Sequence, residues 1–165
     1  MSRISSVTVR QTPVEAIATT GRLIVRAESL LVQTDRRVEL VDITDSVMEG
    51  VRQSGVREGL ANLWSMHTTC ALLINEAQKA LQTDIISLLE SIVDRDAEWQ
   101  HNDPTHSDCD RMNADSHLRA MFLGHGLTLQ ITGGEPVLGQ WQRVLAAEMD
   151  GPRARTIRLQ MMGID

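Results

Sequence analysis

The pattern of apolar and polar positions divides the chain into segments that alternate and segments that repeat every three or four residues. Residues 22–34 and 36–44 are rich in Val, Ile and Leu with partial alternation, and the polar residues 34–36 favour a turn. This pattern predicts an antiparallel hairpin. Residues 59–74 form a long β-prone run, which predicts one strand with its even-numbered positions on one face and His67 on the other.

Two segments have the period of a helix, and a third segment is short. Residues 44–55 carry valines four positions apart on one face, and Gly55 is placed to end the helix. Residues 80–93 place apolar side chains three or four positions apart, which is typical of an amphipathic helix. A short turn or helix is expected over residues 115–124.

The rest of the chain predicts a polar loop and further strands. Residues 94–114 are polar and have no period, and a loop of this length inside a compact domain is usually functional or disordered. Three further strands are expected within residues 127–132, 137–149 and 155–163, and the Gly-Gly pair at 133–134 indicates a hairpin turn.

These elements predict a fold of the α+β class. Its core is a predominantly antiparallel, sandwich-like β structure with one main helix and one or two short helices. The length of 165 residues fits a single domain over residues 1–165. Residues 1–20 are polar and lack a strong period, so they are expected to be a loosely ordered N-terminal arm.

Composition excludes several classes of partner. Lys and Arg total 16 against 22 Asp and Glu, and the chain has three Trp, one Phe and no Tyr, so it lacks both the positive charge and the flat rings of a nucleic-acid binder. The sequence contains no apolar stretch long enough to span a membrane, and its N-terminus lacks the pattern of a secretory signal. A cytoplasmic location is therefore expected. Because the cytosol is reducing, Cys70 and Cys109 are not expected to pair.

The histidines are the main candidates for chemistry. Four of the five, His101, His106, His117 and His125, fall within residues 101–125, and His67 precedes them. Imidazole is the commonest ligand of divalent metals near neutral pH, and catalytic sites draw three ligands from separate elements. None of the standard metal-binding spacings is present, however, and a core histidine bonded to the backbone is the alternative interpretation of His67.

Other polar residues offer catalytic or binding groups. Asn75 and Glu76 follow the predicted strand, where they would either lie near the face of His67 or cap the next helix. Gln142, Arg153 and Arg155 lie on or beside a predicted hairpin near the C-terminus, where arginines either hold phosphate or remain solvated.

Several separate motifs, taken together and in this order, resemble the YjbQ family. They are His67-Thr-Thr-Cys-Ala-Leu-Leu-Ile-Asn75-Glu76, Trp99-x-His101, Asn113-Ala-Asp-Ser-His117-Leu, Leu123-Gly124, Leu138-Gly-Gln-Trp-Gln142 through Glu148, and Asp150-Gly-Pro-Arg153-x-Arg155. The resemblance covers roughly residues 20–163. It implies a small trimeric α+β protein of a family often described as secondary thiamine-phosphate synthases.

The resemblance also implies a polar pocket at a subunit boundary. His67, His101 and His117 would gather there and bind a divalent metal, Zn²⁺ or Mg²⁺, with Asn75, Glu76 and Gln142 as catalytic groups nearby. His106 is the reserve for His101, because in some members the gap to the next histidine is shorter.

Three functions follow from such a pocket. The first joins a pyrimidine pyrophosphate to a thiazole phosphate, with Arg153, Arg155 and Arg119 as the cations that bind the phosphorylated substrate. The second is a metal-dependent hydrolase of a small molecule with Glu76 as general base. The third is a non-enzymatic ligand-binding homotrimer.

Overall fold

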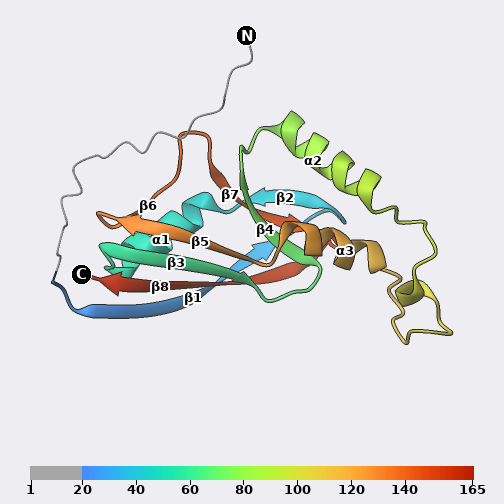
Figure 1. The fold of residues 1–165 in the computed structure, drawn as a ribbon, viewed down its shortest axis with the longest axis horizontal. Helices are drawn as coiled ribbons and strands as arrows, with labels where there is room; N and C mark the ends of the chain where they lie inside the picture. The colour runs from blue at the N-terminus through green and yellow to red at the C-terminus, as the bar shows by residue number, and fades with distance from the viewer. Residues whose placement is uncertain (1–19) are drawn as a thin grey trace, which may run out of the picture.

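The computed structural model describes residues 20–165, which fold into two antiparallel sheets and three α-helices (Figure 1). The elements in chain order are β1 (Leu23–Gln33), β2 (Glu39–Asp42), α1 (Thr44–Ser54), β3 (Glu58–Ser65), β4 (Cys70–Asn75), α2 (Lys79–Ile92), the 3₁₀ turn η1 (Gln100–Asn102), α3 (Ala114–Leu123), β5 (Gly126–Thr132), β6 (Glu135–Pro136), β7 (Arg143–Glu148) and β8 (Ala154–Ile164). The α+β class expected from the sequence is confirmed. The arm predicted over residues 1–20 lies, apart from its last residue, outside the described residues.

Long-range pairing builds the two sheets. The larger has the order β1-β8-β3-β5-β6, and the smaller has the order β2-β7-β4. Strand β8 lies between β1 and β3, and its odd-numbered positions from Arg155 to Met161 are buried while Arg158 and Gln160 are exposed. This alternation follows from the two-residue period of a strand.

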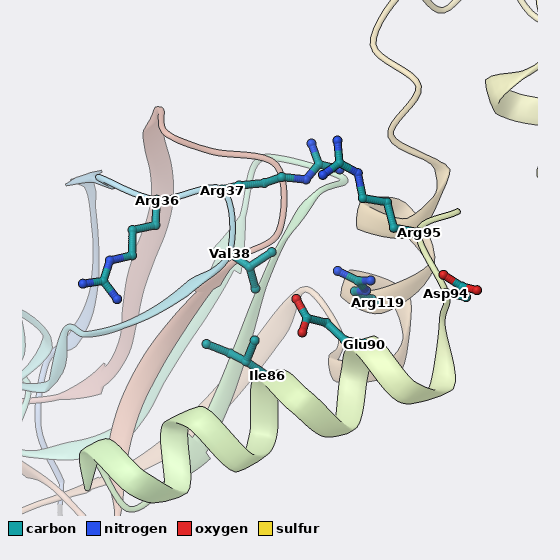
Figure 2. A pocket seen from close by; sticks show the side chains of 8 residues that line it. All are labelled: Arg36, Arg37, Val38, Ile86, Glu90, Asp94, Arg95 and Arg119. Atoms are coloured by element: carbon teal, nitrogen blue, oxygen red, sulfur yellow. The ribbon is translucent and has the colours of Figure 1, made fainter. Parts of the chain in front are cut away.

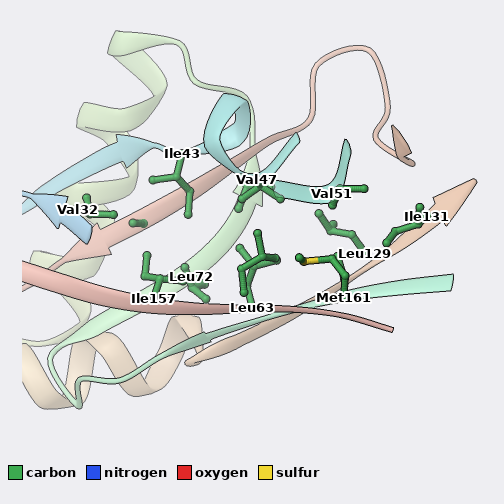
Figure 3. Packing of buried hydrophobic residues seen from close by; sticks show 14 of the residues in the cluster. Val32, Ile43, Val47, Val51, Leu63, Leu72, Leu129, Ile131, Ile157 and Met161 are labelled. Atoms are coloured by element: carbon green, nitrogen blue, oxygen red, sulfur yellow. The ribbon is translucent and has the colours of Figure 1, made fainter. Parts of the chain in front are cut away.

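The main core lies between the two sheets and helix α1 (Figure 3). Leu63 of β3, Leu72 of β4 and Ile157 of β8 are fully buried there. Val47 and Val51 of α1 are also fully buried in this core, which is the face that their spacing of four residues predicts.

A second, smaller core covers the other face of the small sheet. Ala71 of β4 and Ala147 of β7 pack there with Leu89 of α2 and Ala120 of α3. The small residues of the two strands allow helix α3 to lie close to β4. Helix α3 is therefore held against the small sheet, with its N-terminal turn near the end of β7.

The predicted hairpin of residues 22–34 and 36–44 is wrong. Strand β1 pairs with β8 over its whole length, whereas β2 pairs with β7 in the other sheet. The segment between β1 and β2 therefore connects the large sheet to the small sheet. An eleven-residue ladder with β8 offers more backbone hydrogen bonds than a four-residue hairpin partner would.

The single strand predicted over residues 59–74 is also wrong. The run divides into β3 in the large sheet and β4 in the small one, joined by residues 66–69. In β3 the odd positions such as Leu63 face the core, and Trp64 is 52% exposed, which is the reverse of the predicted face. His67 consequently lies in a connection and not on a strand.

The helices agree closely with the sequence. Helix α1 ends at Gly55, whose φ of 76° is the left-handed conformation that glycine adopts readily. Helix α2 spans the predicted amphipathic segment, although Leu88 remains 57% exposed and only Leu89 is fully covered. No helix within residues 20–165 is long and apolar enough to cross a membrane.

Candidate functional site

A polar cleft of about 360 Å³ lies where four segments of the chain meet. These are the β3–β4 connection, the loop before α3, the first turns of α3, and the chain that runs from the end of β7 into the start of β8. The lining residues are Met66, His67, Thr68, Thr69, His101, Cys109, Arg111, Asn113, His117, Asp150, Arg153 and Arg155. The cleft thus brings together the three histidines that the resemblance implied and two of the three arginines expected to bind a phosphorylated substrate.

His67 is bonded to the backbone and also lines the cleft. Its Nε2 accepts a hydrogen bond from the backbone N–H of Thr156 at 2.9 Å. Burial lowers the pKa of His67, and the positive charge of Arg155 lowers it further, against an opposing contribution from Glu148. The ring is therefore neutral near pH 7, and because Nε2 accepts, Nδ1 carries the proton.

His101 and His117 form a pair of imidazoles. Their ring centroids are 5.0 Å apart and the rings are nearly perpendicular, at 84°. Burial lowers the pKa of His117, and the neighbouring His101 lowers it further. The Nε2 atom of His101 is buried and has no hydrogen-bond partner among the described residues, which is unusual for a buried polar atom and marks it as available for a ligand.

Asp150 organises the cationic side of the cleft. Its carboxylate accepts hydrogen bonds from Arg37 at 3.2 Å, Arg111 at 3.4 Å, Asn113 at 2.9 Å and Arg153 at 2.6 Å. Arg37 is also bonded to the buried Asp115. Arg111 and Arg153 therefore share one carboxylate, and this side of the cleft has a surplus of positive charge.

Arg155 is held differently, in a buried ion pair with Glu148. The two side chains are 2% and 1% exposed. Arg155 donates to Glu148 from Nε at 2.5 Å and also from Nη2, and it donates to Thr69 Oγ1 at 3.0 Å. Its donors are thus largely occupied within the protein, in contrast to those of Arg111, whose side chain is 58% exposed.

Arg119 lies away from the cleft, although it was expected to bind the substrate together with Arg153 and Arg155. It lines a separate cavity of about 460 Å³ between α2, α3 and the β1–β2 connection, together with Arg36, Arg37, Val38, Ile86, Glu90, Asp94 and Arg95 (Figure 2). Its guanidinium donates to the backbone carbonyl of Val93 and contacts Asp115. Two positions separate Arg119 from His117, so they face different sides of α3.

The proposed catalytic groups Asn75, Glu76 and Gln142 lie at the opposite end of the small sheet. In the register of β4 and β7, Cys70 is paired with Glu148 at the cleft, and Asn75 is paired with Arg143 at the far end. Five strand residues separate the two ends, which corresponds to about 16 Å. The side chain of Asn75 accepts from the backbone N–H of Glu76, and that of Gln142 accepts from the backbone N–H of Gly139.

The remaining candidates are also placed. His106, the reserve for His101, lies outside the cleft and bonds to Asp103 at 3.0 Å. Both cysteines are free: Cys70 is buried, which raises the pKa of its thiol, and Cys109 lines the cleft. His125 contacts the backbone carbonyl of Thr68 at 3.4 Å.

The side chains of this part of the chain do not form a ready metal site. Within residues 20–165, no group of three or more His, Cys, Asp or Glu side chains is arranged to hold a metal ion. His67 shares the cleft with the His101–His117 pair, but its Nε2 is engaged by the backbone of Thr156. Of the three histidines expected as metal ligands, only His101 and His117 are therefore paired with each other.

Sequence reasoning did not select several residues that shape the cleft. Among them, Arg111 and Asn113 both donate to the carboxylate of Asp150, as described above. Asn113 and Asp150 stand in the motifs quoted for the resemblance, so they carried a signal. Arg111 lies in the unperiodic loop, and no pattern in the sequence distinguishes it from other exposed arginines.

The family model described as UPF0047 protein YjbQ-like matches residues 28–164. The chain belongs to the YjbQ family. A UPF0047 protein of Methanothermobacter thermautotrophicus is 44% identical over 139 residues, covering 84% of this chain and 93% of the relative. The YugU protein of Bacillus subtilis is 29% identical over 137 residues, covering 82% of this chain and 98% of the relative.

Solved structures of YjbQ-like proteins share the fold. A protein of unknown function from Sulfolobus solfataricus has a TM-score of 0.80 and 34% identity, covering 86% of this chain and 99% of that chain. A hypothetical protein from Aeropyrum pernix has a TM-score of 0.77 and 35% identity, covering 84% and 98%. The YjbQ membership and the α+β fold expected from the sequence are both confirmed, and the family is one of unknown function.

Proposed function

We propose that the cleft binds a small phosphorylated molecule. The observation that carries this proposal is the sharing of the single carboxylate of Asp150 by Arg111 and Arg153 beside the neutral imidazoles of His67 and His117. Guanidinium groups bind phosphate oxygens with two parallel hydrogen bonds, and neutral histidines either donate to or accept from the same ligand. A phosphate group supplies the negative charge that this side of the cleft lacks.

The reaction that we propose is transfer with loss of pyrophosphate, of the thiamine-phosphate synthase type. In such a step the carbon–oxygen bond to pyrophosphate breaks, a ring nitrogen of the thiazole phosphate bonds to that carbon, and the leaving group takes the bonding electrons. Arg111 and Arg153 would stabilise the charge that develops on the leaving oxygen. This assignment replaces Arg155 and Arg119, whose donors are occupied inside the protein.

A divalent ion remains part of the proposal. The unpartnered Nε2 of His101 and the neutral ring of His117 are the groups that would hold it, and an ion there would add positive charge next to the phosphate oxygens. Elemental analysis of protein purified without a His tag or added metal tests this. About one ion per chain, lost in the variant His101→Ala with His117→Ala, is expected; an equal metal content in wild type and variant would contradict it.

We also propose that the protein is a cytoplasmic homotrimer. In support, the outer face of the large sheet carries a cross-strand row of apolar side chains, with Val25 55%, Met162 48% and Leu60 44% exposed. An apolar row of this kind favours a contact with another copy of the chain. Sedimentation equilibrium measures the assembly, and the substitution Leu60→Glu is expected to shift it toward the monomer. A wild type that sediments as a monomer or as a dimer would contradict the proposal.

Titration calorimetry with inorganic phosphate and pyrophosphate tests the binding proposal. We expect Arg111→Met to weaken both affinities by about 10- to 100-fold, which is the range for a lost charge-assisted hydrogen bond. Arg57→Met is the matched control, because Arg57 is exposed and lies outside the cleft. Binding that Arg111→Met leaves unchanged would refute this site.

Complementation separates the transfer reaction from mere binding. A strain lacking its thiamine-phosphate synthase is transformed with the wild-type gene, with Arg111→Met or with Arg57→Met. We expect the wild type and Arg57→Met to restore growth without thiamine, and Arg111→Met to fail at equal protein level. Phosphate binding without rescue by the wild type would refute the reaction while leaving the binding site in place.

A further inference from the structure

An apolar cavity adjoins the polar cleft. It has a volume of about 330 Å³ and is lined by Trp99, Gln100, His101, Ala114, His117 and Leu118. His101 and His117 also line the polar cleft, so the pair of imidazoles is the wall that the two cavities share. A ligand bound in the polar cleft therefore lies next to this cavity.

The indole of Trp99 is fixed in place by its one polar atom. Its Nε1–H donates to the backbone carbonyl of Asp94 at 2.8 Å. With that donor satisfied, the rest of the ring presents only apolar surface. Ala114 and Leu118, one turn apart on α3, are the other apolar lining residues.

The cavity has the size and chemistry for a flat ring. A dry cavity of about 150 Å³ is enough for benzene. The present cavity exceeds that size and offers an indole and two imidazoles, whose faces and edges favour stacked or edge-to-face contacts. An aliphatic polyol would leave its hydroxyl groups poorly paired there. Among the described residues of the lining, Gln100 is the only polar side chain besides the histidines and the Trp99 indole, whose N–H is already bonded.

We infer that the Trp99 cavity is a subsite for an uncharged planar ring, so that the ligand class is an aryl or heteroaryl phosphate. This inference rests on the proposed function, because the phosphate group is bound by Arg111 and Arg153 in the adjoining cleft. The ring enters past His101 and His117 and packs on Trp99. The subsite thereby distinguishes ring-bearing phosphates from sugar phosphates and inorganic anions.

A second apolar cavity provides the competing position for the ring. It is lined by Trp64, Ser65, Met66, His67, Thr68 and His125, and it also shares His67 with the polar cleft. Trp64 is 52% exposed on the outer face of β3, and no hydrogen bond fixes its indole within the described residues. Trp99, by contrast, is held by its hydrogen bond to Asp94, and Trp64 serves as the matched control in the experiment.

The test compares three probes by titration calorimetry: phenyl phosphate, glycerol phosphate and inorganic phosphate. For the wild type we expect phenyl phosphate to bind about tenfold more tightly than glycerol phosphate, from ring packing alone. Trp99→Ala is expected to remove this preference and to leave the affinity for inorganic phosphate within twofold, which also shows that the cleft remains folded. Trp99→Phe is expected to retain most of the preference, and Trp64→Ala all of it.

The outcomes separate this inference from the proposed function. Inorganic phosphate that binds without any preference for the phenyl ester would overturn the ring subsite and leave the phosphate site standing. A preference that survives Trp99→Ala and is lost in Trp64→Ala would place the ring in the other cavity and also overturn it. Failure of all three probes to bind the wild type would overturn both proposals.

Discussion

Replacing Arg155 by Met tests whether this arginine stabilises the protein or binds the ligand. In the folded protein its guanidinium is 2% exposed and pairs with Glu148, which is 1% exposed. Burial by itself would lower the pKa of Arg155, but hydrogen bonding to Glu148 and the negative charge of Glu148 raise it. The arginine is therefore charged in the folded protein, and its removal leaves a buried carboxylate without its counter-ion.

The expected cost of Arg155→Met is large. After the substitution, the side chain of Glu148 retains, among the described residues, only the hydrogen bonds from Thr34 at 3.1 Å and from the backbone N–H of Asp150 at 2.7 Å. Removing one partner of a buried ion pair typically costs about 3–5 kcal/mol. For a chain of this length, that corresponds to a decrease in melting temperature of roughly 6–20 °C.

Urea unfolding at pH 7, followed by circular dichroism, measures this cost. The protein concentration is kept the same for all variants, because assembly would make the stability depend on concentration. The control Arg57→Met is expected within about 0.5 kcal/mol of the wild type. The double variant Glu148→Leu with Arg155→Met is expected to recover at least about 1 kcal/mol, since no charge is left buried. An Arg155→Met protein as stable as the wild type but unable to bind phosphate would refute the structural role and restore the substrate-binding role predicted from the sequence.

Three further predictions concern pH and packing. The pKa values of His67 and His117 are lowered from their usual 6.5 in the folded protein, so the unfolded chain takes up protons first as the pH falls. The free energy of unfolding, measured with urea, is therefore expected to fall as the pH drops from about 7 to 5. The substitution His117→Gln is expected to make this pH dependence weaker. Gly59→Ala is expected to prevent folding or lower the melting temperature strongly in calorimetry, since a Cβ there would meet the backbone oxygen of Met162 at 2.2 Å. Leu63→Ala, at a fully buried core position, is expected to cost about 2–5 kcal/mol in urea unfolding. A pH profile of His117→Gln equal to that of the wild type would contradict the first prediction. A melting temperature of Gly59→Ala close to that of the wild type would contradict the second, and a free energy of unfolding of Leu63→Ala close to that of the wild type would contradict the third.

Local patterns in the sequence predicted the helices well and the strand partners poorly. Helices α1 and α2 follow from apolar spacing within one segment, so their signal is contained in the segment itself. The partners of β1 and β2 lie more than 100 residues away, in β8 and β7. The turn residues 34–36 contain no information about which distant strands pair with β1 and β2. The hairpin prediction failed for that reason.

The candidate site was predictable in part. The resemblance placed His67, His101 and His117 in one pocket, and the cleft contains all three. The opposite placement of Asn75 follows from the direction of β4, because a strand that begins at the cleft must end far from it. The burial of Arg155 could be predicted from the alternation of the strand, because Arg155 is an odd-numbered position like Ile157 and the buried apolar residues after it. The exposed Arg111 lies in a loop and had no such signal.

The different hydrogen-bond partners of Glu148 and Asp150 explain how the proposed binding cleft can coexist with buried charge. Glu148 is committed to Arg155, which no ligand needs to displace. Asp150 accepts from four side chains, so when Arg111 and Arg153 turn toward a phosphate it still keeps Arg37 at 3.2 Å and Asn113 at 2.9 Å. A buried carboxylate that loses its only partner would oppose ligand binding by the cost of an unpaired charge. The surplus of partners around Asp150 avoids that cost, and it makes the two arginines of the cleft available to a ligand without unfolding their support.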